Sequence, residues 1–237
     1  MKIKRISAIV LSAALLTGIG LTSSQSAQAA AERYISVSAT GTVKVSPDTV
    51  RINATVTFVG TTSATAQSAV ATSASAVRDA LKSNGVVAQY IKSRTVTIYP
   101  EYNYTPDKGS VLIGYRASQS FEIIVRNAAN AGTVVDAIVA AGGDKLNLEG
   151  VTPFVFDNTA ATDAARTDAV TRAIAKARHY AKLLGVKLAS VTSLDETTSP
   201  SPYPIMMATA KLDSGATQID LGQQDVSVSV AVKWAIK

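Results

Sequence analysis

The feature that most constrains the fold is a two-residue alternation of apolar and polar side chains in several separate stretches. In the clearest stretch the apolar positions are Val50, Ile52, Ala54, Val56 and Phe58. Valine, tryptophan and isoleucine alternate with Ser, Ala and Lys in the same way across residues 226–236, and a shorter case spans 34–40. Because successive side chains of a strand point to opposite faces, this pattern predicts strands with one buried and one wet face.

Two other stretches have helical spacing. After Gly60, apolar side chains recur at Ala66, Val70, Ala74, Val77 and Leu81, and Asn84-Gly85 ends the pattern. The longest predicted helix covers Asp157 to Gly185, with its apolar stripe at Val170, Ile174, Ala177, Ala181 and Leu184. Glycine is the usual residue just past a helix, which supports both endings. A shorter helix is expected around residues 134–139, before Gly142-Gly143.

The remaining pattern predicts further strands and one loop. A long hairpin is expected, with strand 96–104, a turn at Pro106 to Gly109 and a return strand 115–125. Pro100 should lie at a sheet edge or a bulge, because proline cannot donate to a ladder. Strands are also expected at 146–156 and 187–195. Residues 197–222 are rich in Pro, Ser and Gly and predict an exposed loop, in which a short strand near 205–211 is an option.

These elements indicate the α+β class, as two interlocked two-layer subdomains with antiparallel sheets covered by helices. We expect an outer half of about 33–110 plus 223–237 and an inserted half of about 111–196. The inserted half has the order strand, helix, strand, helix, strand, which is compatible with a ferredoxin-like arrangement.

The first 29 residues have the pattern of a cleaved signal peptide. Lys2, Lys4 and Arg5 precede an apolar run that ends in small residues, with cleavage expected after Ala29 or after Ala31. The alternative is an uncleaved anchor, which the Ser, Thr and Gly residues inside the run disfavour. Removal of the three basic residues lowers the formal charge from +6 to +3, so nucleic-acid binding loses its support. The mature chain, 30–237, is then expected outside the cytoplasm, either periplasmic or secreted and cell-wall associated, without a stable transmembrane segment.

Composition excludes several kinds of site. The chain has no cysteine and a single histidine, so disulfides, thiolate chemistry and His-rich metal centres are excluded. His179 is predicted on the wet side of the long helix near Arg172 and Lys176, without a carboxylate to orient it. Asp195 and Glu196 are adjacent and diverge in an extended chain. We therefore expect no catalytic residue, no metal, no cofactor and no enzymatic activity.

Three features are candidates for contact with a partner. Tyr102 and Tyr104 share one face of the predicted hairpin, and rings with polar tips suit sugars, peptides or another subunit. Arg172 and Lys176 could meet a neighbouring subunit or an anionic envelope polymer. Tyr203 lies in the Pro/Ser loop. The plainer alternatives are half-buried sheet packing for the tyrosines and compensation of the helix dipole for the cations, and both are favoured.

Several motifs occur in the order typical of one known family. The run Ile35-Ser-Val-Ser-Ala-Thr-Gly41-Thr-Val-Lys-Val-Ser-Pro47-Asp48 resembles the opening signature of SIMPL-domain proteins. Ala80 to Gly85, Ile98-Tyr-Pro-Glu-Tyr102, Gly114-Tyr-Arg-Ala117 and Ala181-Lys-Leu-Leu-Gly185 follow in the matching order. The resemblance covers residues 34–237. One departure is Ala39-Thr40, where many members have a Gly-Glu pair, so any role of that acid does not carry over.

The resemblance implies a two-part α+β fold, export in bacterial members, assembly into large ring-like oligomers and names that refer to oxidative-stress defence or a periplasmic immunogen. It brings no catalytic residues. The leading hypothesis is an exported, non-enzymatic cell-envelope protein that self-assembles, with a contribution to oxidative-stress tolerance that rests on the resemblance alone. A monomeric peptide- or glycan-binding module and a weak hydrolase are the rival hypotheses.

Overall fold

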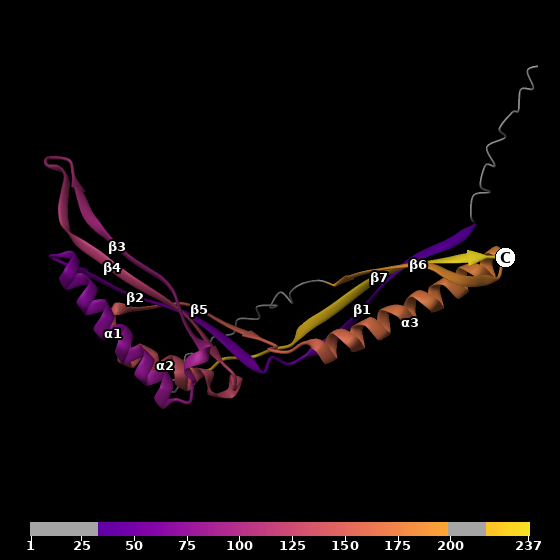
Figure 1. Cartoon of the computed structure of the whole chain (residues 1–237), viewed down its shortest axis with the longest axis horizontal. Helices are drawn as coiled ribbons and strands as arrows, with labels where there is room; N and C mark the ends of the chain where they lie inside the picture. Colours follow the sequence, from indigo (N-terminus) through magenta and orange to yellow (C-terminus); the bar gives the residue numbers. More distant parts are fainter. Residues whose placement is uncertain (1–32, 199–216) are drawn as a thin grey trace, which may run out of the picture. The chain divides into compact units, whose positions relative to one another are not determined.

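The computed structural model describes residues 33–198 and 217–237, which form two antiparallel sheets (Figure 1). The three-stranded sheet has the order β1-β7-β6 and consists of β1 (Tyr34–Val45), β7 (Gln224–Ile236) and β6 (Leu188–Thr198). The four-stranded sheet has the order β3-β4-β2-β5 and consists of β3 (Ile91–Thr105), β4 (Gly109–Val125), β2 (Thr49–Gly60) and β5 (Leu146–Phe154). The predicted α+β class with helix-covered antiparallel sheets is confirmed. The predicted signal peptide, Tyr203 and the strand near 205–211 lie outside the described residues.

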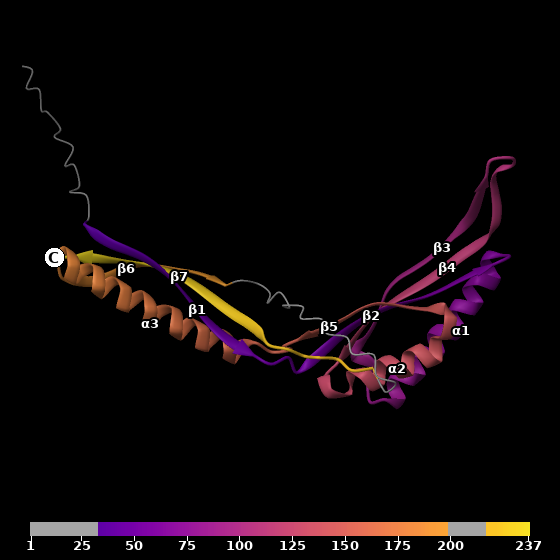
Figure 2. The same ribbon diagram turned by 180° about the vertical axis from the view of Figure 1, so that it is seen from behind.

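The four-stranded sheet and its helices form a ferredoxin-like unit. Its elements follow the order β2-α1-β3-β4-α2-β5, with α1 (Ser63–Ser83) and α2 (Ala131–Gly142). Both helices pack on one face of the sheet and against each other (Figure 2). The strand order with β4 between β2 and β3 is that of the split βαβ arrangement. This unit occupies one contiguous stretch, residues 49–154.

The other half brackets that stretch, because it takes β1 from before it and α3 (Thr159–Leu184), β6 and β7 from after it. β1 pairs with β7 along its whole length, from Tyr34 opposite Ala235 to Val45 opposite Gln224. This grouping differs from the halves expected from the sequence. The alternation pattern shows which face of a strand is buried, but it does not show which strands pair.

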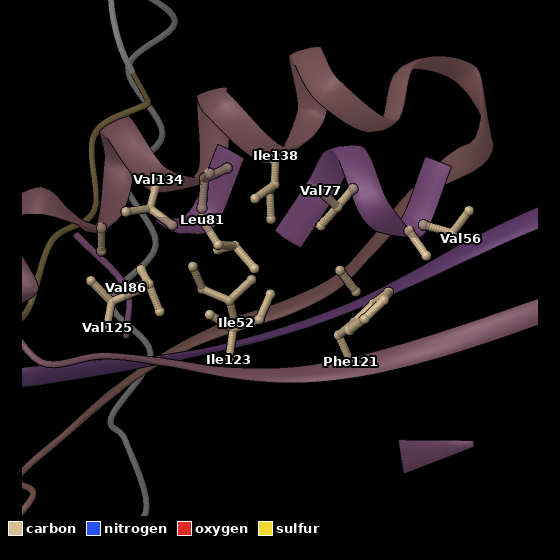
Figure 3. Packing of buried hydrophobic residues seen from close by; sticks show 14 of the residues in the cluster. Ile52, Val56, Val77, Leu81, Val86, Phe121, Ile123, Val125, Val134 and Ile138 are labelled. Carbon is tan, nitrogen blue, oxygen red and sulfur yellow. The ribbon is translucent and has the colours of Figure 1, made fainter. Parts of the chain in front are cut away.

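The core of the four-stranded unit lies between the sheet and both helices (Figure 3). All five apolar residues predicted for the α1 stripe are buried. From the sheet, Ile52 and Ile123 are fully buried, and Leu81 of α1 and Ile138 of α2 approach them in Figure 3. Each such side chain contributes about 1.5–3 kcal/mol by leaving water.

The buried stripe of α3 agrees with the prediction at Ala177 and Ala181 and differs from it elsewhere. Its buried residues recur every fourth position, at Ala165, Ala169, Ala173, Ala177 and Ala181. Val170 and Ile174 are only half-buried at the flank of the stripe, and Leu184 is 64% exposed. The reason is the close approach of α3 to β1, where a Cβ on Gly41 would lie 2.1 Å from the carbonyl oxygen of Ala165. Only small side chains fit between backbones at that separation.

Asp48, in the link between β1 and β2, is hydrogen-bonded to the link that follows β5 and to the segment before α2. Its carboxylate accepts a hydrogen bond of 2.9 Å from the Phe156 amide, which follows β5, and its carbonyl accepts one from the Ala128 amide. Partial burial opposes ionisation of the Asp48 carboxyl, but its hydrogen bonds, foremost that from the Phe156 amide, together with the smaller effect of the Arg126 charge hold its pKa below the ordinary value. Asp48 is therefore a carboxylate that stabilises the native links.

The segment before β7 packs on the ferredoxin-like unit. The amide of Thr217 donates to the Asp136 carboxylate of α2 at 3.0 Å, and the Thr217 hydroxyl donates to the same group. Those hydrogen bonds lower the pKa of Asp136. Ile219 and Leu221 then pack against the core of this unit, although they lead into the three-stranded sheet. The two halves are thus interlocked, as the fold prediction states.

Gly41→Ala tests the close contact of α3 with β1. The added methyl group would overlap the α3 backbone, so we expect the free energy of unfolding to fall by about 2 kcal/mol. Urea denaturation followed by circular dichroism measures this change. Gly150→Ala is the control, because a Cβ at that strand position would meet no heavy atom within 4 Å. Equal stability of Gly41→Ala and the unchanged protein would contradict the packing described.

Asp48→Ala tests the carboxylate between the links. Because the folded-state pKa of Asp48 is depressed, its stabilisation is present above the unfolded pKa of about 3.9 and is lost as the pH falls through the folded value. At pH 7 we expect the variant to lose about 1 kcal/mol of unfolding free energy. The difference should shrink below about pH 4. Asp225→Ala, which removes an exposed pair with Lys44, should change stability little at either pH. A difference that is constant with pH would contradict this role.

Candidate functional site

β3 and β4 continue beyond the rest of their sheet as a two-stranded hairpin (Figure 1). β2 ends at Gly60, which pairs with Tyr115 of β4. The β4 residues before Tyr115 therefore pair with β3 alone. We call residues 100–114 the arm. Both of its strands have one edge without a partner strand among the described residues.

Local sequence explains the shape of the arm. At its turn, the Lys108 amide donates to the Thr105 carbonyl, and Gly109 has a φ of +66°, which glycine adopts without strain. A bulge follows Glu101, so that Ile113 has no partner in the register. Pro100 lies next to this bulge on the outer strand of the sheet, as predicted. The predicted hairpin is therefore confirmed, with a bulge that the alternation did not indicate.

The arm exposes aromatic and aliphatic side chains. Tyr102 is 57% exposed and Tyr104 is 73% exposed. Tyr102 lies opposite Leu112 across the ladder, so these side chains share one face, which we call the tyrosine face. Sheet packing was the favoured explanation for the tyrosines. It is wrong for Tyr102 and Tyr104, whose side chains are exposed.

An ion pair lies where the arm leaves the sheet. Arg116 donates two hydrogen bonds to the Glu101 carboxylate. These bonds lower the pKa of Glu101. Bidentate pairing also fixes the orientation of both groups. At the far end, Asp107 and Lys108 in the turn are of opposite charge, so the arm together with Arg116 at its base has no net charge.

The predicted basic surface of α3 has local partners. Arg172 donates to the Asp168 carboxylate at 2.8 Å, and this bond lowers the pKa of Asp168. Lys176 donates to the Ser38 carbonyl of β1 at 3.1 Å. Both cations are exposed, as is His179. Their geometry suits stabilisation of the helix and of the β1 edge, and contact with a subunit or an anionic polymer stays a prediction. The structure does not join them to the arm tyrosines, which belong to the other sheet.

Hollows in the surface bring hydroxyl groups together more than ionisable groups. On the face of the four-stranded sheet opposite the helices, an open hollow of about 440 Å³ is lined by Ser and Thr with Arg94 and Glu149. Within residues 33–198 and 217–237, no three His, Cys, Asp or Glu side chains are arranged to hold a metal ion. In the same residues, no helix combines the length and apolarity that a membrane span requires.

Sequence reasoning named Tyr102 and Tyr104 but missed three residues beside them. Val111, Leu112 and Ile113 are all more than 40% exposed. Their signal was available, because three consecutive apolar residues after a turn break the alternation of a half-buried strand. Their exposure depends on β2 ending before it reaches them, which the pattern did not reveal.

The chain is similar to known proteins along most of its length. The model of a family described as SIMPL, a protein of unknown function (DUF541), matches residues 35–234. The 26 kDa periplasmic immunogenic protein of Brucella melitensis is 33% identical over 219 residues, 86% of this chain and 84% of the relative. The uncharacterized protein YggE of Escherichia coli K12 is 28% identical over 201 residues, 84% of this chain and 80% of the relative.

A solved structure, of an unknown protein from Galdieria sulphuraria, covers 79% of this chain and 84% of its own at 10% identity, with a TM-score of 0.26. That likeness is too weak to support an argument. The family match covers both sheets and all three helices, from Ile35 to Trp234. The chain therefore belongs to the SIMPL family.

Proposed function

We propose that the protein is exported to the cell envelope, has no catalytic role and self-associates through the arm. The observation that carries this proposal is the set of exposed apolar side chains on a two-stranded hairpin, with Tyr102, Tyr104 and Leu112 on one face. Contiguous exposed apolar surface of this kind is typical of contact sites.

The energetics of the arm favour a partner. A hairpin of two strands is only marginally stable in water by itself, because neither face is covered. Its open edges also offer backbone groups to another strand. Contact with a second surface would bury the tyrosine face and complete the hydrogen bonds of an edge. An arm that stays free gains neither contribution.

The occupant that we propose is a second copy of this chain. Glu101 is neutralised by Arg116, and Asp107 lies beside Lys108 in the turn. Two arms can therefore approach without repulsion between like charges. The same patch on both copies gives a two-fold contact. Insertion of the arm into a bilayer is disfavoured, because Asp107 and Lys108 at the tip would have to enter the hydrocarbon first.

Location outside the cytoplasm is supported by the basic and apolar pattern of residues 1–29 and by the Brucella relative, whose name describes a periplasmic protein. A contribution to oxidative-stress tolerance is supported by the family resemblance alone. A second candidate function, a monomeric module for a peptide or glycan, is supported by the same exposed tyrosines, because such rings also stack on sugars and peptides.

The double change Tyr102→Ala, Tyr104→Ala tests self-association. We expect light scattering of the mature protein to give a mass at least twice that of one chain. We expect the double variant to dissociate at concentrations about 30-fold higher than the unchanged protein, since two interface tyrosines are removed. The matched control is Tyr34→Ala, because Tyr34 is 53% exposed but lies on β1.

Two outcomes would contradict the proposal. A monomeric mature protein at all concentrations would exclude self-association, and peptide or glycan binding abolished by the double change would then support the second candidate. An unchanged assembly in the double variant would show that the contact lies elsewhere than on the tyrosine face.

A further inference from the structure

The arm also carries a sequence motif that self-association does not explain. Glu101-Tyr102-Asn103-Tyr104-Thr105 contains the acceptor pattern of N-linked glycosylation, in which an asparagine is followed two positions later by Ser or Thr. The intervening residue is not proline. The acidic Glu101 stands two positions before the asparagine and gives an extended pattern, Glu-x-Asn-x-Thr. The motif ends directly before the turn of an exposed hairpin.

The folded arm leaves room for a glycan at Asn103. Its side chain is exposed, and the residue lies opposite Val111 in the ladder. Alternate residues of a strand face opposite ways, so Asn103 is on the other face from Tyr102 and Tyr104. A sugar chain on Asn103 would extend into solvent and leave the tyrosine face uncovered. Modification and self-association are therefore compatible on one arm.

Recognition by a transferase requires the arm to open. In the folded state the Glu101 carboxylate is bound by Arg116, and the Thr105 hydroxyl oxygen is shielded from solvent without a hydrogen-bond partner in the described chain. Residues 101–114, which include the whole motif, pair only with each other, so separating them leaves the strand pairing of β2 intact. Segments of this kind open at a small fraction of the global unfolding free energy. The newly exported chain offers the same motif before it folds.

A second, minimal motif provides an internal comparison. Asn53-Ala54-Thr55 has the same three-residue pattern, but Arg51 stands where the extended pattern has an acid. Asn53 lies in β2, which pairs with β4 on one side and β5 on the other. The Thr55 hydroxyl donates to Glu149. Opening this motif would break the centre of the sheet, so the structure distinguishes the two asparagines.

We propose that Asn103 is the acceptor of an N-linked oligosaccharide, transferred outside the cytoplasm from a polyprenyl diphosphate-linked donor. The Asn103 amide nitrogen forms a bond to the anomeric carbon of the first sugar. The bond between that carbon and the diphosphate oxygen breaks, the amide loses one proton, and polyprenyl diphosphate leaves. Nothing is oxidised or reduced. This inference rests on the export that we propose above, but not on self-association.

The test is mass spectrometry of the protein isolated from its own host. Trypsin releases residues 95–108, which contain Asn103, and residues 52–78, which contain Asn53. We expect peptide 95–108 to carry a mass increment that corresponds to whole sugar residues, and peptide 52–78 to have its unmodified mass. Asn103→Gln should abolish the increment in the intact protein, whereas Asn53→Gln should leave it.

Variants of Thr105 distinguish loss of recognition by the transferase from loss of modification through misfolding. Thr105→Ala should abolish the increment, and Thr105→Ser should restore it, because only the hydroxyl is needed at that position. An unmodified peptide 95–108 in protein whose leader has been removed would overturn this inference alone. Recovery of the chain from the cytoplasm with its leader uncleaved would overturn export and this inference together. The number of chains in the assembly should be the same for Asn103→Gln and the unchanged protein, so a failure of self-association would be seen separately from the loss of the sugar.

Discussion

The pairing of β1 with β7 is the constraint on which the rest of this fold depends. It joins residues near the start of the described chain to residues at its end, from Tyr34–Ala235 to Val45–Gln224. The chain that follows β1 must therefore leave this sheet and return to it, with β6 as the first strand to come back. The ferredoxin-like unit, residues 49–154, occupies that excursion as one insertion. Because contacts between sequence-distant strands require loop closure, such a fold forms its three-stranded sheet only after much of the chain is ordered.

Local patterns predicted the elements better than their partners. Alternation identified the buried faces of β1, β2 and β7, because side-chain direction is a local property of a strand. It could not show that β1 pairs with β7, since any strand with a matching face would satisfy the pattern. On α3, helical spacing of apolar residues predicts burial of Val170 and Ile174. The close approach of Gly41 to the helix backbone instead leaves room only for alanine side chains at the buried positions. Size predicts burial only where the spacing of the layers allows it.

In the candidate site, too, local patterns identify residues but not their contacts. Tyr102 and Tyr104 could be named from composition and alternate spacing, whereas their exposure could not. That exposure results from a mismatch in length, since β4 continues past the last residue of β2. The neutral base of the arm depends on Arg116 meeting Glu101, a contact that pairing register alone decides. The scaffold is thus a well-packed layer structure that presents a hairpin with little support of its own.

The segment from Thr217 to Leu221 determines how this molecule can be divided. It is continuous with β7, yet Thr217 is held by α2, and Ile219 and Leu221 cover the core of the inserted unit. Excision of the ferredoxin-like unit as a separate fragment would remove that cover and leave apolar surface open to water. The half that contains the three-stranded sheet thus supplies side chains that complete the core of the inserted unit. A fragment cut at residues 49 and 154 would therefore expose apolar core residues that Ile219 and Leu221 cover in the intact chain.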